Sequence, residues 1–365
     1  MKENVKGKSI LVEDDWHLRV GVTANCNFRC LYCNPRGLKN ISSSLNKKEI
    51  SQILQAAYNC GIRRAHWTGG EPTVRQDFIE LIKAAKDIGF TEQIVTTNGY
   101  KLYKILDVLI KNGLTRVIVS LDTLNPKHNK FITGRKYFYQ TLKSIEESVK
   151  KLSSLTKISA VTMKSTLAEL KHFIHYAQKI NSKGYRGKLA IKLNQFFPSN
   201  PAQLSPEGQE FWKEELVSYK EIIKTLKSIG PLKPFSREKV AGDNPSYRYF
   251  LIGDPEIIVG ILALFSWKYP CGRCHKLRIQ PDGSPSICLN LPKNSTLIGK
   301  SIREKTKILR NLISFRETRL DKLRPDRKHY RPQLGEMRFG KLGEPVSADF
   351  FYKISKKEKI VKNDL

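Results

Sequence analysis

The chain has 365 residues, of which 40% are hydrophobic and 9% aromatic, and its 65 Lys and Arg against 34 Asp and Glu give a net charge of +31. This composition excludes a disordered or collagen-like chain, and the length allows one large α/β barrel plus an addition. The charge favours an anionic partner such as a nucleotide, although a solvated Lys-rich surface explains it equally well.

Strands and helices alternate about six times along the first 200 residues. Strands are expected at 17–24, 63–68, 92–99, 115–122, 157–164 and 187–197, and helices at 45–61, 77–90, 101–113, 137–152 and 167–180. Such alternation implies parallel strands with right-handed crossovers. It predicts an α/β fold, a partial (β/α)6 TIM-type barrel, with the active site at the carboxyl ends of its strands.

The remaining sequence predicts two further parts. Residues 199–300 read as a helix with connectors, followed by strands and a hairpin whose turn is Pro-Asp-Gly at 281–283. Residues 301–365 carry 18 Lys and Arg against 9 Asp and Glu, and the stretch 323–333 is expected to be a basic loop or tail. We therefore divide the chain into a barrel at 1–198, an α+β extension at 199–300 and a basic C-terminal segment at 301–365.

Membrane and export signals are not evident. No apolar run reaches the roughly 18 residues that cross a bilayer. The N-terminal stretch lacks the apolar centre of a secretion signal, so we expect a cytoplasmic protein without a membrane partner.

Seven cysteines are present, and an odd number without an export signal argues against a disulfide framework. Cys60 stands alone and is expected to be buried as a small apolar residue. The other six form two triplets, Cys26-x3-Cys30-x2-Cys33 and Cys271-x2-Cys274-x13-Cys288. Three thiolates leave one position open on a four-iron cluster, so each triplet could hold a 4Fe-4S cluster with room for a ligand from outside the protein. The alternative is zinc, with His17, His66 or His275 completing the sites.

Several motifs resemble those of a known family. CNFRCLYC (26–33) resembles the cluster-binding loop of radical S-adenosylmethionine (SAM) enzymes, and WTGGEP (67–72) resembles their Gly-Gly-Glu-Pro segment. The finer resemblance is to the MoaA-like family, the GTP 3′,8-cyclases of molybdenum cofactor biosynthesis. It extends through TTNGY, RVIVSLDTLNP, ITGR (132–135) and the second cysteine triplet, over residues from about 14 to 292.

The resemblance implies a role for each matching residue. Cys26, Cys30 and Cys33 would hold the 4Fe-4S cluster that cleaves SAM, and Cys271, Cys274 and Cys288 a second 4Fe-4S cluster that binds the substrate. SAM would lie along Tyr32, Gly69, Gly70, Glu71 and Ser120, where the two glycines allow close approach of a ligand. Nucleotide contacts would come from Arg19, Thr97, Lys164 and Arg278. A reductant such as flavodoxin or ferredoxin would supply electrons.

The chain departs from the family pattern mainly in the expected substrate pocket. His66 replaces an Arg, Arg64 lies two positions earlier, and Lys192 and Lys276 replace Arg while keeping the positive charge. These four residues complete the predicted substrate-binding set. Asn194, Gln195 and Phe197 also differ from the family pattern. The charge of His66 is expected to change with pH near neutrality.

These patterns predict a radical SAM enzyme that cyclises or rearranges a small anionic nucleotide or nucleotide-linked substrate. A true GTP 3′,8-cyclase is the first alternative. A radical SAM enzyme acting on a peptide or RNA and a zinc-dependent nucleic-acid-binding module are the others.

Overall fold

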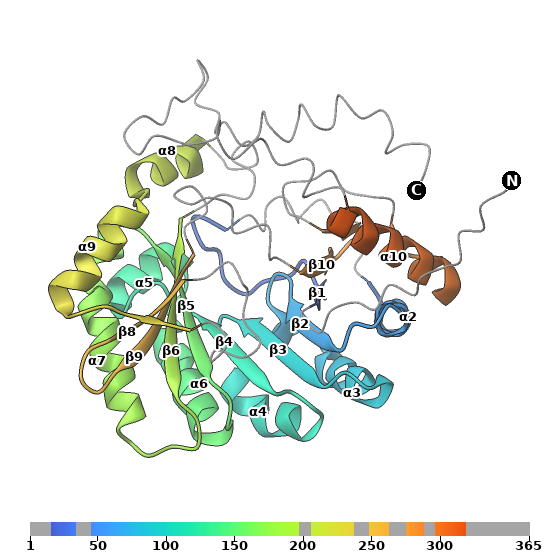
Figure 1. Cartoon of the computed structure of the whole chain (residues 1–365), viewed down its shortest axis with the longest axis horizontal. Coiled ribbons are helices and arrows are strands. Elements are labelled where there is room, and N and C mark those ends of the chain that lie inside the picture. The colour runs from blue at the N-terminus through green and yellow to red at the C-terminus, as the bar shows by residue number, and fades with distance from the viewer. Residues whose placement is uncertain are drawn as a thin grey trace, which may run out of the picture.

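The computed structural model describes residues 16–33, 45–196, 206–236, 248–262, 275–287 and 296–318. Eleven strands in these ranges form one sheet in the order β11-β10-β1-β2-β3-β4-β5-β6-β9-β8-β7 (Figure 1). The central strands, which run parallel to their neighbours, are β1 (His17–Gly21), β2 (Arg64–Thr68), β3 (Glu92–Thr97), β4 (Arg116–Ser120), β5 (Thr156–Thr162) and β6 (Leu189–Gln195).

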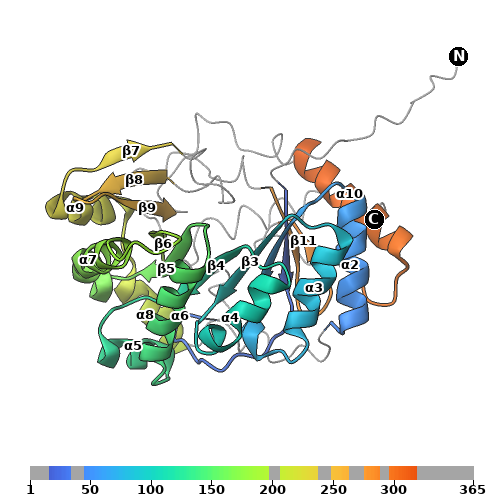
Figure 2. The same ribbon diagram turned by 90° about the horizontal axis from the view of Figure 1, so that it is seen from below.

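Helices connect these strands and lie together on one side of the sheet (Figure 2). They are α2 (Lys47–Asn59), α3 (Phe78–Ile88), α4 (Leu102–Lys111), α5 (Pro126–Thr133), α6 (Phe138–Lys151) and α7 (Leu170–Asn181). Two short 3-10 helices, η1 (Pro72–Val74) and η2 (Lys164–Glu169), follow β2 and β5. The alternation predicted from the sequence is confirmed, and the parallel sheet with its helical layer agrees with a partial barrel.

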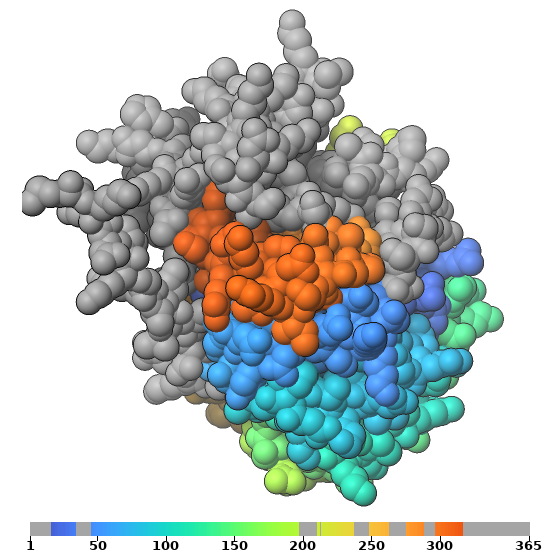
Figure 3. Space-filling model, turned by 90° about the vertical axis from the view of Figure 1, so that its right-hand side faces the viewer, coloured from blue at the N-terminus to red at the C-terminus, as the bar shows by residue number. Residues whose placement is uncertain are grey.

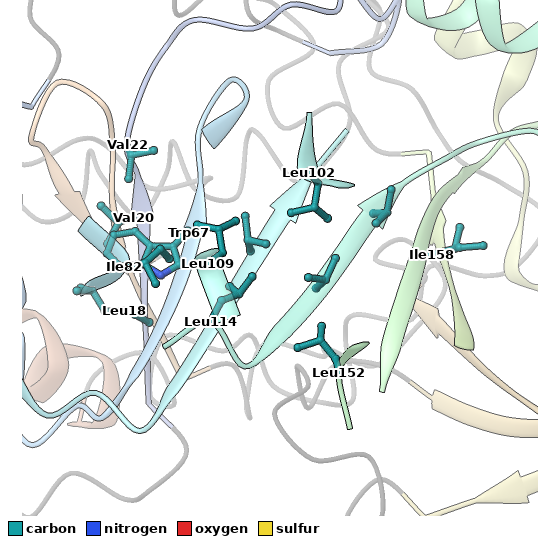
Figure 4. Close-up of a cluster of buried hydrophobic side chains, with 14 of the residues drawn as sticks. Leu18, Val20, Val22, Trp67, Ile82, Leu102, Leu109, Leu114, Leu152 and Ile158 are labelled. Atoms are coloured by element: carbon teal, nitrogen blue, oxygen red, sulfur yellow. The ribbon is translucent and has the colours of Figure 1, made fainter. Parts of the chain in front are cut away.

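The main core lies between the sheet and these helices. Leu18 and Val20 of β1 and Trp67 of β2 point toward the helical layer and are at most 1% exposed (Figure 4). They belong to one cluster with Ile82 of α3 and Leu109 of α4. Because strand side chains alternate between the two faces, the residues between these apolar ones face the opposite side, which we call the inner face.

The predicted extension adds strands to both edges of the barrel sheet. On one edge β9 (Ile257–Leu262) runs parallel to β6 and continues antiparallel into β8 (Arg248–Ile252) and β7 (Lys233–Phe235). On the other edge β10 (Lys276–Ile279) runs parallel to β1 and forms a hairpin with β11 (Pro285–Ser286), as the Pro-Asp-Gly turn predicts. Helices α8 (Pro206–Glu215) and α9 (Tyr219–Ile229) precede β7.

The first part of the basic C-terminal segment is a helix of the folded body. Helix α10 (Ile302–Thr318) lies over α2 (Figure 3). Its Lys305 is fully buried, and the Nζ atom lies 2.8 Å from Glu49 Oε2 and 2.8 Å from Gln52 Oε1. The predicted basic loop at 323–333 lies outside the described residues. Within the part described, no helix is long and apolar enough to span a membrane.

Candidate active site

The first cysteine triplet lies on the loop that leaves the carboxyl end of β1. Cys26 and Cys30 are half-buried and Cys33 is exposed. The Phe28 amide donates to Cys26 Sγ at 3.4 Å, and Asn98 Nδ2 lies 3.9 Å from the same sulfur. Burial raises the pKa of Cys30 well above its usual value, and the charges of Asp122, Cys33 and Cys26 raise it further. The three thiols therefore share one neighbourhood.

The donor set of this loop fits a four-iron cluster. Three thiols are soft ligands of the kind that iron–sulfur clusters take, and they leave one iron open. Within the described ranges, no group of three His, Cys, Asp or Glu side chains could hold a single metal ion. This applies to sites for one ion, whereas the three ligands of a four-iron cluster bind different irons. Since burial raises the pKa of both Cys26 and Cys30, cluster assembly has to displace their protons.

The Gly-Gly-Glu-Pro segment holds this loop in place. The Gly70 amide donates to Thr23 O at 2.7 Å, and the Glu71 amide donates to Asn25 O at 2.8 Å. A Cβ atom on Gly69 would lie 2.4 Å from Thr23 O, and one on Gly70 only 2.2 Å from Asn25 O. Gly69 also has a φ of +139°. The two glycines are therefore required by the approach of the cluster loop itself. Their predicted contact with SAM remains a prediction.

Glu71 connects the ends of β2 and β3. It is 1% exposed and accepts hydrogen bonds from the Thr73 hydroxyl, the Thr97 hydroxyl and the Asn98 amide, each at 2.6 Å. Burial raises the pKa of Glu71, and these hydrogen bonds oppose the increase. Thr97, which the family resemblance suggests as a nucleotide contact, thus donates its hydroxyl hydrogen to Glu71. Asn98 also donates to Asn27 Oδ1 at 2.8 Å, so it joins the end of β3 to the cluster loop.

Asp122 fixes the middle of the cluster loop and was not predicted as a site residue. The Tyr32 hydroxyl donates to Asp122 Oδ2 at 2.5 Å, and the Val161 amide donates to Asp122 Oδ1 at 2.8 Å. Burial raises the pKa of Asp122 to about 6, although both hydrogen bonds lower it. An acid directly after a buried strand was the available signal. Ser120, the last residue of β4 and a predicted SAM contact, is half-buried two positions earlier.

Positive charge is concentrated on the sheet. The eleven described strands contain a single acid, Glu92, and nine basic residues: Arg19, Arg64, Arg116, Lys157, Lys192, Lys233, Arg248, Lys276 and Arg278. Of the predicted substrate residues in this set, Arg19 and Arg278 are paired in register between β1 and β10.

His66 lies at the centre of this charge. It is 7% exposed, and its Nε2 atom is 2.7 Å from Thr96 Oγ1. Burial lowers the pKa of His66 well below its usual value, and the charges of Arg19, Lys276, His17 and Lys192 lower it further. The structure thus brings together four predicted substrate residues from β1, β2, β6 and β10. It also corrects one expectation, because a histidine with so low a pKa stays neutral near pH 7.

Two predicted substrate residues lie elsewhere. Arg64 Nε is 3.5 Å from Glu92 Oε2, and Arg116 bonds to the same carboxylate, at the amino ends of β2, β3 and β4. These ends are opposite the cluster loop. Lys164 does not extend β5 as predicted but begins η2, where it is exposed.

The substituted residues on β6 are engaged in local hydrogen bonds. Asn194 Nδ2 donates to Ser159 Oγ at 2.9 Å, and Gln195 Nε2 donates to Val217 O at 2.8 Å. The second cysteine triplet remains a prediction, because the described residues do not include Cys271, Cys274 and Cys288. They do not include Phe197 either.

Comparison with known proteins agrees with this arrangement. The Radical SAM superfamily matches residues 20–177. The GTP 3′,8-cyclase of Petrotoga mobilis is 32% identical over 278 residues, which cover 75% of this chain and 80% of the relative. A probable GTP 3′,8-cyclase of Pyrococcus abyssi is 30% identical over 283 residues, covering 75% and 84%.

Among solved structures, Streptococcus suis SuiB bound to S-adenosylmethionine has a TM-score of 0.53 at 14% identity, covering 96% of this chain and 74% of that one. This likeness concerns the fold alone. The superfamily match and the relatives together place the chain in the radical SAM superfamily and, within it, in the family of GTP 3′,8-cyclases. It is therefore an enzyme of the MoaA-like type, and its family implies a 4Fe-4S cluster and SAM as cofactors.

Proposed function

We propose that this enzyme is a GTP 3′,8-cyclase, which forms a bond between C3′ of the ribose and C8 of the guanine. The broader prediction, another nucleotide-linked substrate, is less well supported because the relatives that match most of the chain are GTP 3′,8-cyclases. The observation that carries the proposal is the cationic inner face. Arg19, Lys192 and Lys276 lie around His66, and β1, which carries Arg19 and pairs with β2 and β10, leads directly into the cluster loop.

The chain supplies binding and orientation for this reaction. Arg19 and Arg278 offer planar donor sets that suit phosphate oxygens, and Lys192 and Lys276 act as compact charges. His66, kept neutral, offers a hydrogen bond without another charge. Pairing of β10 with β1 fixes the backbone of Lys276 and Arg278 beside Arg19. A substrate bound there would be oriented by several strands at once.

The residues that we expect to bind the first cluster and SAM lie on the cluster loop, after β2 and at the end of β4. Cys26, Cys30 and Cys33 would hold the first cluster, and Tyr32, Gly69, Gly70, Glu71 and Ser120 would line SAM. Cys271, Cys274 and Cys288 would hold the second cluster next to the substrate, just before and after the β10–β11 hairpin. When bound, the first cluster and SAM supply a 5′-deoxyadenosyl radical that removes hydrogen from the substrate.

The proposal is tested by substrate-dependent formation of 5′-deoxyadenosine. Anaerobically reconstituted enzyme is incubated with SAM, dithionite and each of GTP, ATP, CTP, UTP and guanosine. We expect GTP to stimulate 5′-deoxyadenosine formation far more than the others. Stimulation by a different nucleotide would support the broader prediction, and stimulation by none would overturn both.

A pair of lysine variants tests whether the inner face binds GTP. Lys276→Met should raise the KM for GTP about 10- to 100-fold, because a hydrogen bond to a charged group contributes roughly 1.5–3 kcal/mol. Lys233→Met is the matched control, since Lys233 is an exposed residue of β7 at the far edge of the sheet and pairs with Glu256. Equal KM values for the two variants would contradict the assignment.

A further inference from the structure

Helix α5 lies directly against the outer side of the cluster loop. The Arg29 amide donates to Thr133 O at 2.9 Å, and the Leu31 amide donates to Ile132 O at 2.9 Å. The cluster loop, drawn in dark blue, runs along the edge of the molecule toward α5 in Figure 2. The helix therefore forms the surface next to Cys30, which lies between the two bonded loop residues.

Neighbouring residues on these two segments point in opposite directions. Tyr32 and Ile132 pack inward in one small cluster with Met163. The residues just before them point outward, and Leu31 is 42% and Phe131 62% exposed. Large apolar side chains with this much exposure are few in the described part of the chain, and two of them lie on the two segments that are hydrogen-bonded beside Cys30. A surface of this kind commonly binds another protein.

The charge around these two residues has one sign. Between Asp122 and Glu146 the sequence contains five basic residues and no acid, and between Asp15 and Glu49 it contains no acid either. Arg29, Lys127, Lys130 and Lys136 are all exposed. Among the described residues, two carboxylates bond to this region, and neither is more than 17% exposed. Asp122 accepts a hydrogen bond from Tyr32, and Glu169 accepts hydrogen bonds from Thr123 and Leu124 and lies 3.4 Å from His128 Nδ1. We call the surface formed by Arg29, Leu31, Lys127, Lys130, Phe131 and Lys136 the α5 patch.

We propose that the α5 patch is the docking surface for an acidic protein that carries one electron on an exposed redox group. In the step it serves, the reduced carrier loses one electron and the oxidised cluster gains it, with no other reactant. Positive charge around an apolar centre would steer such a partner and hold it briefly, as suits a small electron-transfer interface. The proposal rests on membership of the radical SAM superfamily and is independent of which nucleotide is the substrate.

Charge reversal on the patch tests the proposal with a flavodoxin as the probe. Reduced acidic flavodoxin is mixed with reconstituted enzyme in a stopped-flow instrument, and flavin oxidation is followed at low and high salt. The double variant Lys127→Glu/Lys130→Glu should slow the second-order rate at low salt about tenfold or more, and should lose most of its salt dependence. Phe131→Ala should slow it by a smaller factor and keep the salt dependence.

Helix α4 provides matched controls. It carries exposed Lys104 and Lys111 on either side of Val108, which is 45% exposed. Lys104→Glu/Lys111→Glu and Val108→Ala change charge and apolar surface by similar amounts away from the cluster loop. We expect both to keep the flavodoxin rate of the unmodified enzyme within about twofold.

Dithionite separates docking from the integrity of the site, since this small reductant needs no docking surface. All variants should form 5′-deoxyadenosine with dithionite at the unmodified rate, and their cluster absorbance should be unchanged. An equal loss with dithionite and flavodoxin would show that the lysines support the cluster loop, and would overturn the proposal. The proposal would also be overturned if Lys127→Glu/Lys130→Glu left the flavodoxin rate unchanged, or if Lys104→Glu/Lys111→Glu reduced that rate equally. Failure of the GTP assay above would leave all of these outcomes unaffected.

Discussion

Two groups of basic residues on the inner face differ in what surrounds them. At the amino ends of the strands, Arg64 and Arg116 share the carboxylate of Glu92. Around His66 lie Arg19, Lys192 and Lys276, and the described strands that carry them hold no acid. In the first group, one carboxylate offsets part of the charge of two arginines. The second concentrates charge and keeps a histidine neutral, which suits binding of an anion. Similar residues of one sheet thus differ in role because Glu92 of β3 lies beside the first group, whereas β1, β6 and β10 contain no acid within their described ranges.

The largest expected effect comes from removing charge around His66. The double variant Lys192→Met/Lys276→Met should raise the KM for GTP by at least about 100-fold, because two charge-assisted contacts are lost. The free energy of unfolding should change much less, since Met keeps most of the apolar volume of the Lys side chain. Steady-state kinetics with urea unfolding measures both quantities. A large loss of stability with an unchanged KM would reverse the assignment of the two groups.

The converse is expected for the other group. Glu92→Gln should lower the free energy of unfolding by about 1–3 kcal/mol, because Arg64 and Arg116 lose a largely buried ionic partner. The KM for GTP should stay within about twofold. Urea unfolding of the apoprotein reports the first quantity, and Glu80→Gln, which removes a partner of Lys47 on the exposed surface, is the control. A KM that rose with the loss of Glu92 would extend the substrate site to this group.

A smaller effect is expected from pH. The pKa of His66 is lower in the folded than in the unfolded protein, so this residue favours folding above its unfolded value of about 6.5. That contribution is lost as pH falls below 6.5, by up to about 1.4 kcal/mol per pH unit. His66→Gln should remove this part of the pH dependence, which is measured as the difference between the two unfolding curves from pH 7.5 to 5.5. Parallel curves would show that His66 takes up a proton as readily in the fold as outside it.

The smallest effect concerns a cysteine outside both groups. Cys60 is 5% exposed, burial raises its pKa to about 11, and its Sγ atom lies 3.6 Å from Thr306 O of α10. Because the reactive thiolate is scarce below this pKa, iodoacetamide at pH 8 should label Cys33 of the apoprotein and leave Cys60 unlabelled. Peptide mass spectrometry distinguishes the two, and labelling of Cys60 without unfolding would show that α10 does not cover it.

Local sequence was sufficient to predict the alternating strands and helices of the parallel sheet and to suggest the cysteines of the cluster loop. Periodicity located the strands and helices, and spacing identified Cys26, Cys30 and Cys33, because both signals are contained within a few turns of chain. Because side chains alternate between the two faces of a strand, Arg19 and His66 lie on the same face of the sheet as Lys192 and Lys276. This alternation is why four predicted substrate residues come together.

Other features depend on contacts between distant segments. The ion pair of Arg64 requires the register of β2 against β3. The low pKa of His66 arises first from its burial and then from titratable groups on three other strands. The pairing of α5 with the cluster loop joins residues about 100 positions apart. Asp122 and Asn98 belonged to motifs that the sequence marked out, but their bonds to Tyr32 and Asn27 become evident only once the loop is folded over the strand ends.

The central claim is that the cationic inner face presents the ribose of GTP to the radical formed at the cluster loop. Anaerobic turnover of GTP deuterated at C3′, with mass analysis of the 5′-deoxyadenosine produced, tests this claim most directly. We predict that deuterium appears in 5′-deoxyadenosine, and that Lys192→Met/Lys276→Met loses the transfer while retaining SAM binding. Formation of 5′-deoxyadenosine without deuterium in the unmodified enzyme would contradict the claim.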